Sequence, residues 1–286
     1  MIFSAAVKNN PMPDKLLICT DLDRTLIPNG PQPASPRAMP LFRKLVSRPG
    51  IKLAYVTGRD KKLVMDAIGH FNLPVPDYAV TDVGSAVYNI QSGRWRRRID
   101  WDQHICRDWE NKSPKELAVF LSDIAQCRLQ EEEKQGRYKL SYYVPLSINP
   151  GILAGEIQLR MTQHGLQTNT IWSIDEQKRT GLLDILPASA DKRKAIEFLI
   201  KTNAFDYART IFSGDSGNDQ AVLLSPIKSV IVANASPELK SQIREQVGAT
   251  VFSDRLYIAR GGYLNMNGNY AAGILEGINH YFPELK

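Results

Sequence analysis

Short apolar segments that are followed at once by polar residues constrain the fold of this 286-residue chain more than any other feature. Residues 16–20, 52–56 and 77–81 each have the composition of a buried strand, and segments of helical periodicity separate them. The second of these helices is predicted to run from about Asp60 to His70. The alternation returns from Leu182 onward, where LLDIL, RTIFS and SVIVA are the predicted strands. Strands that alternate with helices are typical of a parallel sheet flanked by helices. We therefore expect an α/β fold with a doubly wound, Rossmann-like core.

The middle of the chain has a different pattern. Ser113 and Glu116 form a capping box with Pro114 at the first helical position, which predicts a helix start. The strand-like segment YKLSYYV, a helix ending at Gly165 and the strand-like segment TNTIWSI follow, and the charge run 131–134 is interpreted as a solvated connection. We expect an inserted α+β cap domain over residues 99–185, between core segments over residues 1–98 and 186–286.

Charge and cysteine usage exclude several classes of protein. The 36 Lys and Arg residues exceed the 30 Asp and Glu residues, so the formal net charge is +6, which favours anionic ligands in general. The basic run 94–98 has no nucleic-acid-binding module around it. It is interpreted either as a solvated edge that raises the local concentration of anions or as an edge strand protected by charge. Three cysteines without CxxC spacing indicate neither a disulfide framework nor a zinc site. With no long apolar run and no signal sequence, we expect a cytoplasmic protein that binds neither membrane nor nucleic acid.

Acidic residues follow two of the predicted strands. Asp21 and Asp23 come directly after LLICT, and Asp215 and Asp219 lie in the segment GDSGND after RTIFS. Ligands of open α/β sheets bind beyond the carboxyl ends of the strands. If these strands are neighbours, the four carboxylates crowd together and resist joint ionisation unless they share a cation. An all-oxygen set of ligands suits Mg²⁺, so we predict a magnesium site formed by these residues.

A carboxylate pair beside a metal ion suits phosphoryl transfer through an aspartyl-phosphate. Asp21 is the candidate nucleophile, and Asp23 could protonate the leaving alkoxide and later deprotonate water. Thr57 and Gly58, which follow the strand KLAYV, would hold phosphoryl oxygens. Lys192, in the first turn of a predicted helix, would add a cation beside a helix N-terminus.

Four segments in order, DLDRTL, VTGR, DKRKAI and GDSGND, resemble the motifs of haloacid dehalogenase (HAD) superfamily phosphatases. Within that superfamily, TDVGSAVY, KLSYYV, LLDILPASADKRKAIEFL and VIVANASPEL resemble the sucrose-phosphate phosphatase family, and the resemblance spans nearly the whole chain from Leu16 onward. It implies a doubly wound core, a cap inserted between the second and third motifs, Mg²⁺, and hydrolysis of a disaccharide phosphate.

Carried over to this sequence, the resemblance makes Asp21 the nucleophile and a metal ligand. It makes Asp23 the acid/base and a ligand through its carbonyl, Asp215 the third protein ligand, and Asp219 a residue that steadies the metal. One departure is Arg193, where the family usually has Gly after the lysine. This departure leaves Lys194 as an alternative to Lys192.

The cap would select the substrate, because the core binds only the phosphate, which every ester shares. The candidates for contact with the sugar are Lys139, Ser141, Tyr142, Asp184 and Asn218. The expected reaction is hydrolysis of sucrose 6-phosphate to sucrose and phosphate, and a sucrose-phosphate synthase-like glycosyltransferase is an expected partner. Two alternatives stay open. One is a phosphatase for another disaccharide or amino-sugar phosphate, of the mannosylfructose phosphate or kanosamine 6-phosphate type. The other is a catalytically silent sugar-phosphate-binding module.

Overall fold

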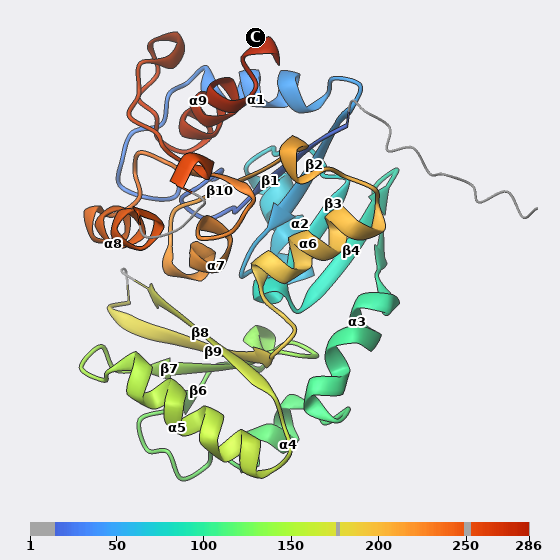
Figure 1. Ribbon diagram of the computed structural model, residues 1–286, viewed down its shortest axis with the longest axis vertical. Coiled ribbons are helices and arrows are strands. Elements are labelled where there is room, and N and C mark those ends of the chain that lie inside the picture. The colour runs from blue at the N-terminus through green and yellow to red at the C-terminus, as the bar shows by residue number, and fades with distance from the viewer. Residues whose placement is uncertain (1–14, 176–177, 249–252, 286) are drawn as a thin grey trace, which may run out of the picture.

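The computed structural model describes residues 15–175, 178–248 and 253–285, and Figure 1 shows a large sheet above a smaller one. The large sheet has eight strands in the order β12-β11-β10-β1-β2-β3-β4-β5. Neighbouring strands from β12 to β3 are parallel, whereas β4 and β5 are antiparallel additions at one edge. The bounds are β1 Leu16–Thr20, β2 Ile51–Val56, β3 Tyr78–Thr81, β4 Ala86–Gln91, β5 Arg94–Arg97, β10 Thr210–Gly214, β11 Lys228–Ile231 and β12 Leu256–Ile258.

Helices cover both faces of this sheet, so the predicted doubly wound core is confirmed. On one face, α1 (Ala38–Val46), α2 (Lys61–His70) and α9 (Ala271–Tyr281) bury side chains such as Phe42 and Ile274 against the strands. Another apolar cluster contains side chains from α6 (Lys192–Thr202), α7 (Gln220–Leu223) and α8 (Pro237–Gly248). The predicted start of α2 is also confirmed, because the Asp60 side chain accepts a hydrogen bond from the Leu63 N–H.

The smaller sheet is antiparallel, has the order β6-β7-β9-β8, and lies below the core in Figure 1. Its strands are β6 (Arg128–Leu129), β7 (Leu140–Val144), β8 (Thr168–Asp175) and β9 (Thr180–Pro187). Helix α3 (Ile99–Ile105) leads out of the core, and α4 (Pro114–Val119) and α5 (Pro150–Gln163) belong to the cap. The predicted capping box at Ser113 and Glu116 is present at the start of α4.

One predicted strand belongs to a different sheet. The sequence analysis groups LLDIL with the strands of the core, although the predicted cap bounds include residues 182–185. The structure places LLDIL in β9, which pairs antiparallel with β7 and β8 of the cap. The reason is that a short apolar run indicates a buried strand without indicating its partners. Strand β9 continues to Pro187, two residues past the predicted end of the cap. The division of the chain at residues 98 and 185 stays a proposal.

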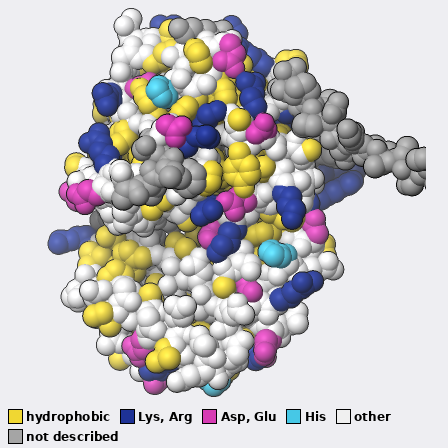
Figure 2. All heavy atoms as spheres, viewed as in Figure 1, with side chains coloured by type: hydrophobic (Ala, Val, Ile, Leu, Met, Phe, Trp, Pro, Cys, Tyr) yellow, Lys and Arg dark blue, Asp and Glu magenta, His cyan; other side chains and the backbone are white. Residues whose placement is uncertain are grey.

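The charged segment near residue 95 forms β5, which is the last strand of the large sheet, as predicted. On the face shown in Figure 2, Lys and Arg side chains are interspersed with Asp and Glu side chains and form no single basic stripe. None of the helices in the described residues has the length and apolar character needed to cross a bilayer.

Candidate functional site

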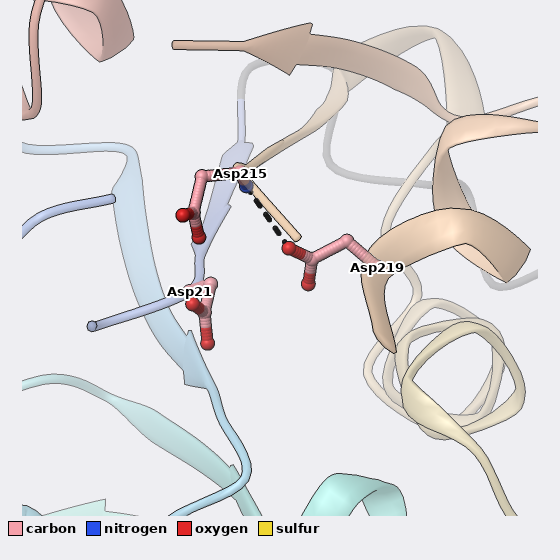
Figure 3. Close-up of side chains that lie close together, drawn as sticks. All are labelled: Asp21, Asp215 and Asp219. Atoms are coloured by element: carbon pink, nitrogen blue, oxygen red, sulfur yellow. Dashed lines mark hydrogen bonds between the residues drawn. The ribbon is translucent and has the colours of Figure 1, made fainter. Parts of the chain in front are cut away.

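The carboxyl ends of β1 and β10 lie side by side and bring distant acidic residues together. Thr20 is the register partner of Ser213, and the Asp21 N–H donates to the Ser213 carbonyl at 2.9 Å. Figure 3 shows the side chains of Asp21, Asp215 and Asp219 converging on one small volume. A ligand oxygen from each of these three lies within 4.8 Å of the others, and all three residues are buried. The juxtaposition that the sequence predicts for these three residues is therefore present.

The loop after β10 has a conformation that depends on Gly214. Asp219 Oδ2 accepts hydrogen bonds from the backbone N–H groups of Asp215 at 3.0 Å and Ser216 at 3.1 Å. A Cβ atom added at Gly214 would lie 2.5 Å from Asp219 Oδ2, so only glycine leaves room for this carboxylate. The Thr25 hydroxyl donates to Asp215 Oδ1 at 3.1 Å. Two groups thus orient Asp215. The Thr25 hydroxyl binds its side chain, and the Asp219 carboxylate binds its backbone N–H.

Lys192 is fully buried and joins the acidic residues from the N-terminus of α6. Its ammonium lies 3.0 Å from Asp21 Oδ1, 2.6 Å from Asp219 Oδ1 and 2.7 Å from Asn218 Oδ1. Burial opposes the charged form, but the charges of Asp21 and Asp219 outweigh burial and raise the pKa of Lys192. The Lys194 ammonium instead donates to the Ala188 carbonyl at 2.6 Å. The geometry therefore favours Lys192 over Lys194 as the lysine of the site.

The acidic residues carry more negative charge than Lys192 can balance. Burial, together with repulsion from Asp219 and Asp215, raises the pKa of Asp21 well above its ordinary value although Lys192 opposes this. Burial and the Asp219 charge raise the pKa of Asp215 to about 7. A cation that binds only oxygen ligands would relieve this repulsion. The residues present therefore fit a divalent cation such as Mg²⁺, because Asp21, Asp215 and Asp219 each offer a carboxylate oxygen to one small volume. Asp219 also binds Lys192 and the Asp215 N–H, and Asp215 is also contacted by Thr25 and Arg24.

Asp23 lies at the same edge but is bound to a different partner. Arg59 Nε and Nη2 donate to its two carboxylate oxygens at 2.7 Å and 2.6 Å, and the Asn29 amide donates at 2.7 Å. Burial acts to raise the pKa of Asp23, but Arg59 and Asn29 outweigh it, so the net shift is downward. The Asp23 side chain is 42% exposed and faces the cavity described below. Its predicted carbonyl ligation of a metal stays a prediction.

A cavity of about 920 Å³ lies between the core and the cap. Its core side includes Asp21, Asp23, Thr57 and Gly58, so the predicted phosphate-binding residues line the same space as the predicted nucleophile. Of the five predicted sugar contacts, three line the cavity, namely Lys139, Asp184 and Asn218.

The other two predicted sugar contacts do not line the cavity. Tyr142 shares the strand face of Leu140 and Val144 and lies in the hydrophobic core, where burial raises its pKa to about 12. The alternation along β7 turns this side chain away from the cavity, so the geometry does not support its predicted contact with a sugar. Ser141 is buried and donates to Asp184 Oδ1, so it orients a residue that does line the cavity.

Several cavity residues have no role in the predictions from sequence. Arg24 and Arg59 lie inside two of the recognised motifs, and a cationic side chain beside predicted phosphate ligands is the signal that could have identified them. Trp172 lies in the predicted strand TNTIWSI, where polar and apolar residues are mixed and no motif marks the tryptophan as part of a site. Lys134 belongs to the charge run that we interpreted as a solvated connection. That interpretation is wrong in part, since Lys134 lines the cavity and its ammonium donates to the Tyr143 hydroxyl at 2.6 Å.

Known proteins resemble this chain over most of its length. The family model described as sucrose-6F-phosphate phosphohydrolase matches residues 14–282. A protein of Nitrosococcus oceani described only as a HAD-like hydrolase is 46% identical over 96% of this chain and 74% of its own length. A mannosylfructose-phosphate phosphatase of Agrobacterium fabrum is 27% identical, with coverage of 93% of this chain and 96% of the relative. Sucrose-phosphatase 1 of Nicotiana tabacum is 28% identical over 93% of this chain, which spans 59% of that longer protein.

Solved structures show the same architecture. The sucrose-phosphatase of Synechocystis, determined in complex with sucrose and phosphate, matches with a TM-score of 0.75 and 25% identity over 93% of this chain and 98% of its own. A HAD subclass IIB sugar phosphatase matches with a TM-score of 0.55 and 14% identity over 79% of this chain and 91% of its own, and this likeness concerns the fold alone.

Proposed function

Because the chain belongs to the sucrose-6F-phosphate phosphohydrolase family and is a phosphatase of the HAD superfamily, we propose that it hydrolyses sucrose 6-phosphate to sucrose and phosphate with the aid of Mg²⁺. The observation that carries this proposal is the position of Asp21. Its carboxylate faces a cavity that also contains Thr57, Gly58 and residues of the cap, and Lys192 lies against it. A nucleophile beside both anion-binding groups and a sugar-sized space suits cleavage of a sugar phosphate.

In the first step, an Asp21 carboxylate oxygen attacks phosphorus, the bond from phosphorus to the sugar oxygen breaks, and Asp23 gives its proton to the leaving alkoxide. In the second step, Asp23 takes a proton from water, whose oxygen attacks phosphorus and releases inorganic phosphate and free Asp21. Arg59 holds the pKa of Asp23 below its ordinary value, so Asp23 has to leave Arg59, take up a proton from solvent and contact the sugar oxygen before the first step. Thr57 and the Gly58 amide would bind phosphoryl oxygens.

The proposed cation would be held by Asp21 and Asp215, with the Asp23 carbonyl as a further ligand. Bound there, Mg²⁺ supplies positive charge that stabilises the phosphoryl oxygens of the transition state. Lys192 keeps Asp21 in a fixed position beside this charge and balances Asp219. Asp219 in turn keeps the loop that carries Asp215 in place.

A second candidate substrate is mannosylfructose phosphate, because the Agrobacterium relative that carries this name matches end to end. Amino-sugar phosphates remain a third class to test. A catalytically silent sugar-phosphate-binding module would not require the Asp21 and Asp23 pair, so we do not favour it. We infer that the proposed substrate comes from a sucrose-phosphate synthase-like glycosyltransferase, and we place the reaction in the cytoplasm.

The proposal is tested with a panel of esters under one set of conditions with Mg²⁺. The panel contains sucrose 6-phosphate, mannosylfructose phosphate, kanosamine 6-phosphate, glucose 6-phosphate and fructose 6-phosphate. We expect the highest kcat/KM for sucrose 6-phosphate, at least about tenfold above the monosaccharide esters, since cap contacts to a second ring add binding energy in the transition state. Asp21→Asn serves as the inactive control. A preference for either monosaccharide ester contradicts the proposal.

A further inference from the structure

A buried ion pair joins the core to the cap at the edge of the cavity. Asp82 follows β3 in the core, Lys139 precedes β7 in the cap, and the Lys139 ammonium lies 3.3 Å from Asp82 Oδ1. The Asp82 side chain is only 11% exposed, and the Lys139 side chain only 7%. Gly136 of the cap packs on the same carboxylate, since a Cβ added there would lie 3.3 Å from Asp82 Oδ1. The pair is thus enclosed by both domains, and separating the domains would leave each charge without its partner.

The backbone around Asp82 has an unfavourable conformation. Asp82, Val83 and Gly84 have consecutive φ values of +53°, +59° and +107°, although Val is β-branched and is rarely found at positive φ. The surrounding structure has to enforce such a turn. A Cβ added at Gly84 would lie 2.2 Å from the backbone carbon of Asp191, the residue that caps α6. The turn is therefore pressed against the helix N-terminus that carries Lys192.

The same turn also holds the predicted phosphate-binding segment. The Asp82 N–H donates to the Arg59 carbonyl at 2.9 Å, and the Val83 N–H donates to the Thr57 carbonyl at 3.1 Å. Val83 lines the cavity, and a Cβ added at Gly58 would lie 3.8 Å from Val83 Cγ2. A displacement of Asp82 would consequently move the backbone on which Thr57 and Gly58 depend.

We propose that Asp82 and Lys139 form a latch that holds the cap closed and, through the turn 82–84, fixes the phosphate-binding segment 57–59 when the cap is in place. Both are positioning residues in this role. Removal of one charge leaves the other buried without its partner, which disfavours the closed arrangement. Coupling of this kind makes phosphate binding depend on cap closure. The choice of a sugar phosphate as the substrate in the kinetic test rests on the proposed function. The contacts that form the latch do not depend on it.

The test uses Asp82→Asn, Lys139→Met and the double variant. Asn tolerates positive φ, so Asp82→Asn removes the charge without adding backbone strain. The matched control is Lys115→Met with Glu132→Gln, which removes a Lys–Glu pair of the cap whose side chains are 87% and 83% exposed. Asp82→Glu, which retains the carboxylate, serves as the conservative variant. Thermal unfolding establishes that each variant is folded.

The first measurement is hydrogen exchange of the free full-length protein, which requires no substrate. We expect the Val83 amide and the amides of residues 57–59 to exchange about tenfold faster in either single variant, with the control unchanged and Asp82→Glu closer to the parent. Equal exchange in the parent and Asp82→Asn overturns the latch. Because no ester is present, this result stands even if the proposed substrate is wrong.

The second measurement is a double-mutant cycle on kcat/KM for the best ester of the panel. A latch predicts a loss of about tenfold in each single variant, with a larger change in KM than in kcat, and no further loss in the double variant. If Lys139 acts only by touching the sugar, the losses from Asp82→Asn and Lys139→Met are independent and multiply. Multiplied losses overturn the latch. If the parent hydrolyses no sugar phosphate, the proposed function fails, and hydrogen exchange alone decides the latch.

Discussion

The Lys192 ammonium lies 3.0 Å from Asp21 Oδ1, although the two residues are 171 positions apart in the chain. Asp21 directly follows strand β1, and the capped N-terminus of α6 carries Lys192. The contact fixes the predicted nucleophile in one orientation and supplies a positive charge where phosphoryl transfer needs it. It also explains why a lysine can be fully buried, since two carboxylates compensate its charge.

Lys192→Met therefore removes a charge from the site while keeping a long side chain. We expect kcat to fall by about 10²–10³-fold, which is typical for the loss of one group that stabilises the transition state. We also expect lower stability, because Asp21 and Asp219 lose a buried partner, and breaking a buried pair costs about 3–5 kcal/mol. Steady-state kinetics and thermal unfolding measure the two effects.

The matched control is Lys194→Met, because Lys194 lies in the same turn but contacts the Ala188 carbonyl and Asp191 and none of the acidic residues of the site. We expect kcat of this variant to stay within about twofold of the parent, as for a surface substitution away from the chemistry. An equal loss of kcat in both variants would contradict the choice of Lys192 over Lys194, the alternative that Arg193 left open.

Gly214→Ala tests the loop that carries two of the acidic residues. The added methyl group would lie 2.5 Å from Asp219 Oδ2, so the carboxylate has to leave the N–H groups of Asp215 and Ser216. Leaving buried polar groups unpaired costs about 1–3 kcal/mol each, so we expect a clear fall in the unfolding free energy together with a loss of Mg²⁺-dependent activity.

Gly155→Ala is the control for that substitution. Gly155 lies inside α5, and an added Cβ meets no heavy atom within 4 Å. Alanine favours a helix over glycine by about 0.5–1 kcal/mol, so this variant should be slightly more stable and equally active. A Gly214→Ala protein as stable as Gly155→Ala would contradict the role assigned to Asp219.

Mg²⁺ binding should depend on pH through Asp215, whose pKa is raised to about 7 in the metal-free protein. A raised carboxyl pKa means that the folded protein retains this proton up to about neutral pH, and the proton competes with the metal. Added Mg²⁺ should consequently raise the melting temperature more at about pH 8 than at about pH 6. The measurement is thermal unfolding with and without Mg²⁺ after treatment with a chelator. Asp215→Asn should abolish the gain, and a gain that is equal at both pH values would refute the assignment.

The predictable part of the site follows from short-range geometry. Residues after parallel strands share one edge of the sheet, so the positions of Asp21 and Asp215 after two apolar segments predict that they meet if those strands are neighbours. The structure shows that β1 and β10 are neighbours. The helix signals at Asp60 and Ser113 are equally local and are confirmed. The helix starts required only the residue order, whereas the meeting of Asp21 and Asp215 also required the pairing of β1 with β10.

The rest depends on contacts between distant segments. Nothing local distinguishes a cap strand from a core strand in LLDIL, and the charge run gave no sign that Lys134 reaches the cavity. The orientation of Tyr142 could have been predicted, because residues two positions apart on a strand share one face and Tyr142 lies two positions from both Leu140 and Val144. The contact of Arg59 with Asp23 could not have been predicted, because it depends on how two loops lie relative to each other.

The most direct test of the account is to trap the phosphoenzyme. In the proposed mechanism Asp23 both protonates the leaving alkoxide and activates the water, so Asp23→Asn is given p-nitrophenyl phosphate, whose leaving group departs without a proton. Only the second step is then slowed, and the variant should accumulate the aspartyl-phosphate in the presence of Mg²⁺. Acid quenching followed by peptide mass spectrometry locates the phosphate. We expect the phosphate on Asp21. Phosphate on another residue, or a burst of p-nitrophenolate with no phosphorylated peptide, would contradict the proposed mechanism.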